Sequence, residues 1–340
     1  MKDSEQIDIY VLTRNSIPII SECLAALKEQ TYENYTVTVI DGSSTDGTEQ
    51  VIKDSGFELL SVPYDYTIPE KRQIALKTST AKYVAFIDSD CIAPPNWLSN
   101  LIEYHPKIHD LGLGIVDVGA TGGSLITTGD AFDKSIGTVL HSKLGAGLSM
   151  QGKLIDCEWK KVQFVPSLAT ANIIYNREHA LSVGGFNTSI TGCEDAELNS
   201  RLDGSDFAIL YIPDSGVKHY HSHSHTINGQ KYTGFLRWVK TYSEARGEAI
   251  IKGGLRMSSP VYFIPLVALL FWGLMMIFLP LAGIGLLLSY LTIMLLYPIY
   301  LLSQDDSNAS LLDVPFLLLI LHAGWAIFLV TGLIKGLRNR

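Results

Sequence analysis

Residues 83–90 read Tyr-Val-Ala-Phe-Ile-Asp-Ser-Asp, five mostly apolar residues followed by two carboxylates that a serine separates. A short apolar run of this kind predicts a strand that is buried on both faces, as the strands of a parallel sheet are. Two carboxylates at positions i and i+2 point to the same side and can share a hard divalent cation. A solvated turn is the alternative for so short a motif. The following Pro94-Pro95-x-Trp97 favours an ordered site.

The alternation of strand and helix patterns continues on the N-terminal side of this stretch. Strand and helix patterns alternate at residues 7–12, 18–27, 35–40, 48–53, 57–62 and 70–78. This order predicts an α/β domain with a Rossmann-like, mostly parallel sheet and flanking helices. Ligands bind such sheets beyond the carboxyl ends of the strands, so the polar residues that follow each strand are the candidate site.

The C-terminal part of the chain has a different composition. Residues 260–302 contain no Asp, Glu, Lys or Arg, and a second apolar run covers residues 311–334. Because about 20 apolar residues span a hydrocarbon core, these runs predict two to three transmembrane helices. We therefore expect a globular domain at residues 1–259 and a transmembrane region at residues 260–340.

The topology of this membrane region has two solutions. The apolar runs predict an integral membrane protein of the plasma membrane or an endomembrane. Residues 1–20 show no signal-peptide pattern, so we expect the N-terminal domain to be cytoplasmic. Three crossings would place the basic tail, which includes Lys335, outside and the acidic 303–310 loop inside, against the positive-inside tendency. Two crossings, with part of 260–302 at the interface or re-entrant, would satisfy it.

The overall composition excludes several classes of protein. Hydrophobic residues make up 47% of the 340 residues, which excludes a disordered chain. The net charge of −8 excludes a protein that binds nucleic acid by neutralising phosphates. The sequence contains no P-loop motif, no G-x-G-x-x-G after the first strand and no C-x-x-C pair.

A second acidic cluster follows the strand pattern at 35–40. It begins with Asp41-Gly-Ser-Ser-Thr-Asp46. Asp41 can accept hydrogen bonds from a ribose or a base, whereas Asp46 has the spacing of a turn residue that caps the next helix.

Two more clusters lie further along the chain. Glu194 and Asp195 precede an amphipathic stretch and can act as helix-capping residues or as an orienting group and a general base. Four histidines alternate with other residues from His219 to His225. One of them can complete a metal site, while the others line a polar cleft or face solvent.

Together these motifs resemble those of family 2 glycosyltransferases. The matching segments in chain order are Thr13 to Asn15, Val39 to Thr48, Phe86 to Asp90, and Gly184 to Phe186 followed by Gly192 to Asp195. The resemblance covers residues 7–225. It implies a GT-A fold, a UDP- or GDP-sugar donor, Mn²⁺ or Mg²⁺, and inversion at the anomeric carbon.

The resemblance also implies a role for each matching residue. Donor binding is assigned to Thr13, Asn15, Asp41, Arg72, Asp88 and Asp90, and metal binding to Asp90, His219 and Asp88. Asp195 resembles the base that deprotonates the acceptor hydroxyl, with Glu194 beside it. The acceptor side is assigned to Asn172, Arg237 and Trp238.

The sequence departs from the family pattern in two places. The loop after the first strand reads Leu12-Thr-Arg-Asn15, which puts its donor contacts in doubt. Processive members carry Q-x-x-R-W near the membrane, and here Gly234 stands where Gln is expected, before Arg237 and Trp238. This difference is evidence against a polymer synthase.

The position of the basic residues before the membrane helices bears on the acceptor. Arg237, Lys240 and Arg246 can bind a lipid phosphate at the interface or serve as ordinary juxtamembrane charges. We expect transfer of a single sugar to a lipid-linked acceptor in the membrane, either a polyprenyl or dolichyl phosphate or a lipid-linked oligosaccharide. A small processive polysaccharide synthase and a non-catalytic GT-A-like scaffold are the alternatives. The retained acidic and histidine motifs speak against the scaffold.

Overall fold

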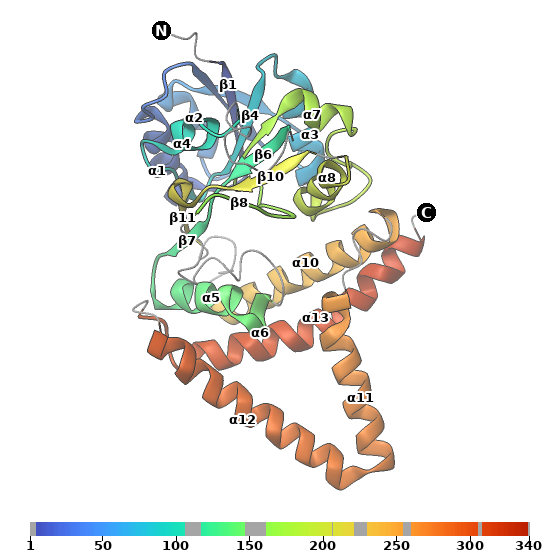
Figure 1. Cartoon of the computed structure of the whole chain (residues 1–340). Helices are drawn as coiled ribbons and strands as arrows, with labels where there is room; N and C mark the ends of the chain where they lie inside the picture. The colour runs from blue at the N-terminus through green and yellow to red at the C-terminus, as the bar shows by residue number, and fades with distance from the viewer. Residues whose placement is uncertain are drawn as a thin grey trace. The chain divides into compact units, whose positions relative to one another are not determined.

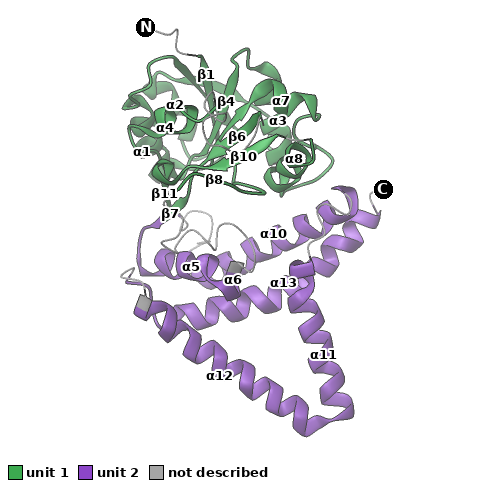
Figure 2. Ribbon diagram, viewed as in Figure 1, with its two compact units in different colours: residues 1–126, 156–219 green, residues 127–155, 220–340 purple. Residues whose placement is uncertain are grey.

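The computed structural model describes residues 5–105, 117–146, 161–205, 207–220, 230–253, 260–304 and 308–338. The chain forms two compact units (Figure 2). The first comprises Met1–Ile126 and Asp156–His219, and the second comprises Thr127–Ile155 and Tyr220–Arg340. We call them the sheet unit and the helical unit. The predicted boundary between a cytoplasmic domain and a membrane region at residue 259 stays a prediction.

The sheet unit is built on an eight-stranded sheet in the part of the chain that is described (Figure 1). Its strands are β1 (Ile7–Thr13), β2 (Tyr35–Asp41), β3 (Glu58–Ser61), β4 (Tyr83–Asp88), β6 (Val118–Gly122), β8 (Gln163–Phe164), β9 (Asn172–Asn176) and β10 (Ala208–Tyr211). The strand order is β3-β2-β1-β4-β9-β6-β10-β8. The first four strands in this order are parallel, β9 is antiparallel to both its neighbours, and β10 is parallel to β6. The predicted α/β class with a mostly parallel sheet is confirmed.

Helices flank this sheet, as the alternating pattern predicts. They are α1 (Ile17–Lys28), α2 (Thr48–Ser55), α3 (Ile68–Thr78), α4 (Trp97–Ile102), α7 (Arg177–Ser182) and α8 (Glu194–Asp203). Helix α3 begins with a capping box, in which Thr67 and Glu70 satisfy each other's backbone N–H groups. The apolar face of α1 is fully buried in the same core as the inner strands. A small sheet consists of β5 (Cys91–Ile92), β11 (Val217–Tyr220) and β7 (Leu125–Thr128), in this order. Strand β5 follows β4 closely in the chain.

The helical unit contains the apolar C-terminal segments. Its elements are α5 (Ala131–His141), α6 (Lys143–Ala146), α10 (Lys231–Gly253), α11 (Ile264–Phe278), α12 (Pro280–Gln304) and α13 (Asp313–Arg338). Among the described residues, three helical segments are long and apolar enough to cross a membrane: Pro260–Phe278, Pro280–Ser303 and Asp313–Arg338. Three long apolar C-terminal helices therefore support anchoring in a membrane, as the sequence predicts. A core of α5, α10, α12 and α13 side chains holds the unit together.

Helices α10 and α13 touch through their backbones. A Cβ added at Gly247 of α10 would lie 2.6 Å from the carbonyl oxygen of Leu329, and one added at Gly332 of α13 would overlap the backbone of Glu244. The backbones can approach this closely only because Gly247 and Gly332 have no side chain, as in the small-residue interfaces of membrane helices.

Candidate active site

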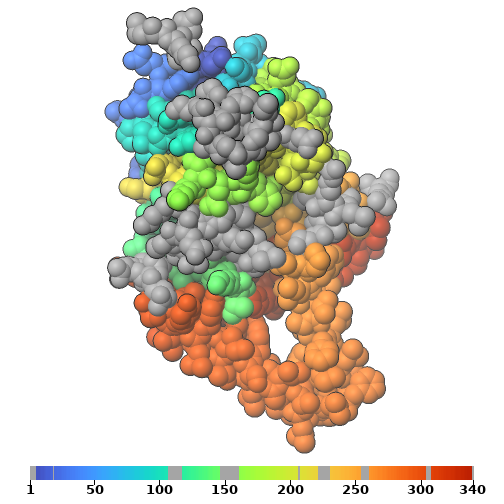
Figure 3. Space-filling model, in the orientation of Figure 1, coloured from blue at the N-terminus to red at the C-terminus, as the bar shows by residue number. Residues whose placement is uncertain are grey.

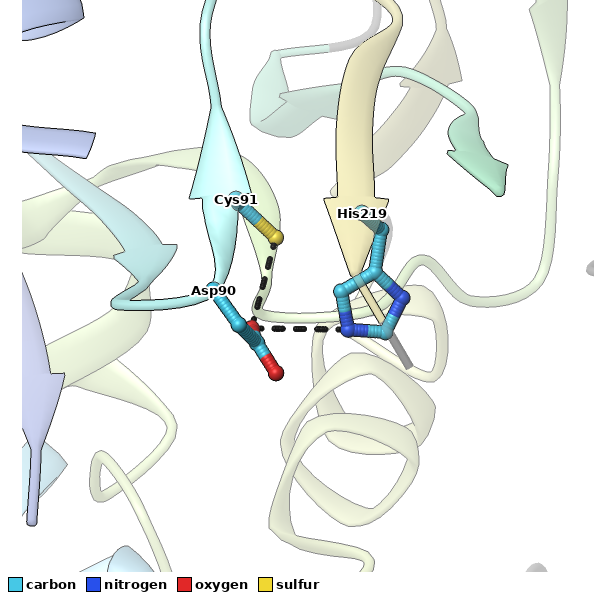
Figure 4. Close-up of side chains that lie close together, drawn as sticks. All are labelled: Asp90, Cys91 and His219. Carbon is cyan, nitrogen blue, oxygen red and sulfur yellow. Dashed lines mark hydrogen bonds and ion pairs between the residues drawn. The ribbon is translucent and has the colours of Figure 1, made fainter. Parts of the chain in front are cut away.

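The D-x-D motif sits at the end of β4, as predicted, and continues directly into β5. In the small sheet, β5 pairs antiparallel with β11 so that Cys91 lies opposite His219. The Nε2 atom of His219 is 3.4 Å from Oδ1 of Asp90, and the thiol of Cys91 is 3.8 Å from the same oxygen (Figure 4). The three potential ligand atoms lie within 4.8 Å of one another.

The donor set at this point fits a divalent cation. The side chains of Asp90 and His219 keep 18% and 13% of their surface exposed, so a ligand can reach them. Carboxylate and imidazole groups are ligands of Mn²⁺, and Mg²⁺ binds to one or two carboxylates together with substrate phosphates. Cys91 is fully buried, and burial raises the pKa of its thiol well above the usual value. We therefore regard Cys91 as a core side chain that supports the pair.

Arg72 connects the D-x-D motif with the Glu194-Asp195 pair. Its side chain is buried, and Nη2 donates to Oδ1 of Asp88 at 2.9 Å while Nη1 donates to Oε1 of Glu194. Residues 72, 88 and 194 thus meet from helix α3, strand β4 and helix α8. The predicted donor contact of Arg72 and the predicted metal contact of Asp88 stay predictions, because in this structure the two side chains bind each other.

The charges around Arg72 are unequal in number. Burial raises the pKa of Glu194 to about 7 against the attraction of Arg72, and the negative charge of Asp195 adds to the increase. Burial also raises the pKa of Asp88, which Arg72 opposes. One guanidinium therefore faces the field of three carboxylates, and its own pKa is raised by Glu194 and Asp88 despite burial.

Asp195 occupies the first turn of α8, next to Glu194. It is only partly buried, and one of its carboxylate oxygens accepts a hydrogen bond from the backbone N–H of Ala196 at 2.7 Å. Helix N-termini favour negative charge, which suits a carboxylate that must be ionised to accept a proton. Glu194 is held by Arg72, whereas Asp195 is the more accessible of the two.

The Gly184-Gly185-Phe186 motif fixes the approach to α8. Both glycines have positive φ angles, and a Cβ added at Gly185 would overlap the side chain of Gln73. The side-chain carbonyl of Gln73 accepts the backbone N–H of Phe186 at 2.7 Å. The turn is thus fitted against α3, the helix that also carries Arg72.

The loops after β1 and β2 hold each other. The amide carbonyl of Asn15 accepts from the backbone N–H of Thr45, and the backbone N–H of Asn15 donates to the hydroxyl of Ser44, both at 2.8 Å. Asp41 is fully buried and accepts the backbone N–H of Ser44. Asp46 accepts from the backbone and hydroxyl of Thr48 and from the backbone N–H of Ile17; it holds the first residue of α2 from the position before the N-cap Gly47.

Two buried polar groups beside Asp41, the Lys71 ammonium and the Thr13 hydroxyl, have no hydrogen-bond partner among the described residues. The sequence motifs predict Thr13 as a site residue but not Lys71. Lys71 is only 7% exposed, and among the described residues its ammonium has no hydrogen-bond or ion-pair partner. A Cβ added at Gly42 would overlap this ammonium. The hydroxyl of Thr13 is buried without a partner in the described part of the chain. Thr13 pairs in register with Asp41, so the two side chains point to the same face of the sheet.

The signal that could have revealed Lys71 lies in the period of α3. The buried face of this helix includes Lys71 and Arg72 together with Ala75 and Leu76. A lysine on the apolar face of a helix calls for an explanation, because fully buried lysines are rare unless they are paired. Burial and the nearby Arg14 lower the pKa of Lys71, while the charge of Asp41 opposes this.

Comparison with known proteins agrees with the order of these motifs. Residues 8–140 match the model of the family described as glycosyl transferase family 2. The matched segment contains both the Asp41 loop and the D-x-D motif.

Residues 8–140 thus belong to glycosyltransferase family 2.

Two relatives of this glycosyltransferase are named for transfer to lipid-linked sugars. A dolichyl N-acetyl-alpha-D-glucosaminyl phosphate 3-beta-D-2,3-diacetamido-2,3-dideoxy-beta-D-glucuronosyltransferase from Methanococcus voltae is 24% identical over 97% of this chain and 98% of its own. A UDP-Glc:alpha-D-GlcNAc-diphosphoundecaprenol beta-1,3-glucosyltransferase from Escherichia coli is 31% identical over 30% of this chain. A glycosyltransferase from Haemophilus influenzae is 30% identical over 32% of it. The two bacterial relatives are matched over only 40% and 35% of their own lengths.

A solved structure shares the fold. The mannosyltransferase from Pyrobaculum calidifontis, determined in complex with GDP-Man and Mn²⁺, aligns with a TM-score of 0.61 at 17% identity. The alignment covers 100% of this chain and 89% of the mannosyltransferase. The GT-A fold that the sequence motifs imply is thereby confirmed.

The remaining predicted residues belong to β9 and α10. The amide of Asn172 is fully buried, accepts from the indole of Trp97 at 2.7 Å, and donates to the carbonyls of Ser124 and Ser215. Arg237 and Trp238 belong to α10 of the helical unit, where Arg237 is exposed and Trp238 stacks on Phe235. The predicted acceptor contacts of these three residues stay predictions. The histidines at 221, 223 and 225 lie outside the described residues.

Proposed function

We propose that this family 2 glycosyltransferase transfers a single sugar from a UDP- or GDP-sugar to a lipid-linked acceptor in the membrane, with inversion at the anomeric carbon. The observation that carries the proposal is the double contact of Arg72 with Asp88 and Glu194. It joins the end of β4, where a donor diphosphate would bind, to the start of α8, where a base is available. A scaffold without catalytic function has no need for a buried arginine shared between these two motifs.

The donor diphosphate would bind where Asp90 and His219 approach each other. These two side chains would hold Mn²⁺ or Mg²⁺, with Asp88 on the donor side. A divalent cation there would offset the charge that builds up on the departing nucleotide. The relatives support this assignment, since the mannosyltransferase of the same fold was determined with Mn²⁺.

The nucleotide base would bind beside Asp41. A carboxylate accepts hydrogen bonds, and an ammonium such as that of Lys71 donates them. Uracil offers an N–H next to a carbonyl oxygen, and guanine does the same with its N1–H and O6. Cytosine and adenine present an amino donor beside a ring-nitrogen acceptor instead. Asp41 and Lys71 with the unpartnered hydroxyl of Thr13 therefore favour UDP- or GDP-sugars over CDP- and ADP-sugars.

Asp195 would act as the general base. It removes the proton of the acceptor hydroxyl while the oxygen attacks C1 from the face opposite the leaving nucleotide, which inverts the configuration. Glu194 is the weaker candidate, because Arg72 holds it in a buried position. Glu194 instead fixes the start of α8 and thereby the position of Asp195.

The acceptor assignment rests on the relatives and on the membrane helices. The Methanococcus voltae and Escherichia coli relatives are named for transfer to dolichyl phosphate and undecaprenyl diphosphate sugars. Arg237 of α10 is exposed and available to a phosphate. We also propose that the sheet unit faces the cytoplasm, since the basic Lys252 precedes the first apolar helix.

Calorimetry on the detergent-purified full chain tests the donor side. UDP-, GDP- and CDP-sugars are titrated with Mn²⁺ or Mg²⁺ and again with chelator. We expect one UDP- or GDP-sugar to bind in a metal-dependent manner and Asp90→Asn to lose that dependence, while the matched turn variant Asp46→Asn binds the metal–donor complex normally. Absence of binding across the panel, or unchanged metal dependence in Asp90→Asn, would contradict the proposal.

A transfer assay tests the acceptor side. Product formation from the identified donor is measured with polyprenyl phosphate, lipid-linked oligosaccharide and the corresponding soluble sugars. We expect product only with the lipid-linked acceptors, and we expect Asp195→Asn to abolish it while donor binding persists. Full activity of Asp195→Asn would overturn the assignment of the base.

A further inference from the structure

Helix α13 runs parallel to α10 over nearly the whole length of both helices. At their N-terminal ends, the hydroxyl of Tyr232 donates to Asp313. At their C-terminal ends, a Cβ added at Gly336 would lie 2.8 Å from Cβ of Ile251. Between these points Glu244 accepts hydrogen bonds from Thr331 and Lys335. The two helices therefore run in the same direction and lie side by side from end to end.

Both ends of α13 contact segments that precede the first apolar helix in the chain. At the N-terminal end, the backbone N–H of Ser310 donates to the hydroxyl of Ser135 in α5 at 2.8 Å. At the C-terminal end, Gly336 meets Ile251 near the end of α10. The ends of a helix that crosses a bilayer lie on opposite sides of a hydrocarbon core about 30 Å thick. If α13 crossed the bilayer, α10 would have to cross it as well, because the two helices are in contact from end to end.

Helix α10 is not suited to cross a membrane. It carries seven charged side chains: Lys231, Arg237, Lys240, Glu244, Arg246, Glu248 and Lys252. Two of these, Arg237 and Lys240, are exposed on the surface of the helical unit. Charged side chains in the bilayer centre are costly and rarely face lipid. The length and apolar composition of α13 alone do not reveal this constraint, because it comes from the neighbouring helix.

Helices α11 and α12 differ from α13 in their surroundings. In the apolar segment Pro260–Phe278, which includes α11, 0% of an 18-residue apolar stretch is buried. The corresponding share is 11% for Pro280–Ser303, which lies in α12, and 39% for α13. Helix α11 runs away from α10 and α13 to a turn, and α12 runs back from that turn toward the start of α13 (Figure 1). Near the turn, the indole of Trp272 donates to the carbonyl of Gly283. Figure 3 shows open space between α11 and α12 along part of their length, although the two helices meet near the turn, where a Cβ added at Gly283 would overlap Met276.

We propose that α11 and α12 alone cross the membrane as a hairpin, and that α13 lies in the interface beside α10. The exposed apolar side chains of α13, Phe316, Ile327, Ile334 and Leu337, would then rest in the boundary between lipid head groups and acyl chains. The positive-inside tendency is satisfied as well, because Lys335 and Arg338 come to the same side as Lys252. The partner of this surface is the lipid of the same membrane that holds the hairpin.

Cysteine labelling of the full chain in membrane vesicles tests the topology. Four exposed positions are substituted one at a time: Glu33→Cys in the sheet unit, Leu281→Cys at the hairpin turn, Leu312→Cys before α13 and Arg338→Cys at its end. A membrane-impermeant maleimide is applied to right-side-out and inside-out vesicles, with the wild-type chain as background. We expect positions 33, 312 and 338 to react from one side and position 281 from the other. Reaction of positions 312 and 338 from opposite sides would overturn the proposal.

Depth measurement with spin labels gives an independent test. Labels at positions 316, 327 and 334 lie on one face of α13, and labels at positions 264, 271 and 278 along α11 serve as the matched control. We expect the three α13 labels to report the same shallow depth and the middle label of α11 to be the deepest of its set. A deep middle position on α13 would show that this helix crosses the membrane.

Discussion

Replacement of Arg72 by Met gives the sharpest test of the active-site arrangement. Methionine has nearly the volume of the arginine stem and removes both guanidinium contacts. Arg72 is 4% exposed, and its two partners, Asp88 and Glu194, are partly and almost fully buried. The substitution leaves two carboxylates without their shared cation.

The size of the effect follows from these contacts. A hydrogen bond to a charged group contributes about 1.5–3 kcal/mol, and removal of one partner of a buried ion pair costs about 3–5 kcal/mol. Part of this loss is relieved because Glu194, whose pKa is already about 7, takes up a proton when Arg72 is absent. We therefore expect Arg72→Met to lose about 3 kcal/mol of stability.

The effect on catalysis is separate from the effect on stability. Without Arg72, the start of α8 loses its link to the end of β4, so Asp195 is no longer fixed relative to the donor. We expect kcat to fall by about a hundredfold, because small misplacements of reacting groups reduce rates by about this factor. The assay combines thermal unfolding in detergent with transfer kinetics at a temperature where the variant is folded.

A matched control and a clear refutation complete this test. Lys77→Met changes an exposed cation on the same helix and should leave both stability and kcat unchanged. Arg72→Lys keeps the charge but lacks the two separate terminal nitrogens with which Arg72 contacts Asp88 and Glu194, so we expect an intermediate result. If folded Arg72→Met transferred sugar at the wild-type rate, Arg72 would not position the two motifs.

Three further predictions concern other parts of the molecule. Because the pKa of Glu194 rises on folding from 4.5 to about 7, its contribution to stability is full below pH 4.5 and is lost as pH rises through 7, by about 3 kcal/mol; denaturant titrations from pH 5 to 8 should show this slope, and Glu194→Gln should flatten it. Lys71→Met should weaken UDP or GDP binding about tenfold and leave the weak binding of CDP unchanged in calorimetry, whereas an equal loss for all nucleotides would exclude a role in base selection. Gly332→Ala should destabilise the α10–α13 pair by about 1–3 kcal/mol; Gly273→Ala in α11, where nothing lies within 4 Å of the added Cβ, should not lower Tm, and equal Tm values for the two variants would rule out close backbone packing.

Local sequence patterns were sufficient to predict the first half of the sheet. The runs that form β1, β2 and β4 are rich in apolar and β-branched residues and end in polar residues, so the pattern predicts both the strand and the place where it ends. The polar ends of β1, β2 and β4 also come together as predicted, because parallel neighbours end at one edge. These features depend on residues close in the sequence.

Long-range pairing explains what the sequence did not reveal. Strand β9 joins the sheet between β4 and β6 in antiparallel orientation, although it begins 89 residues after β4 begins. Nothing in Asn172–Asn176 specifies these neighbours. The meeting of Arg72 with Glu194 depends on the same pairing, since it joins residues 122 positions apart. A motif scan finds each residue, but not their contact.

The helical unit illustrates a limit of hydropathy as evidence of membrane crossing. The apolar run that became α13 has the length and composition of a crossing helix, yet Gly324, Gly332 and Gly336 recur in it at multiples of four residues. This spacing places them on one face of a helix, where they admit the backbone or side chains of α10. Hydropathy averages over all faces of a helix, whereas the glycine face specifies a protein neighbour. Because the neighbour α10 carries seven charged side chains, which are costly to place in the bilayer centre, the position of α13 in the membrane depends on α10 and not on the apolar content of α13 alone.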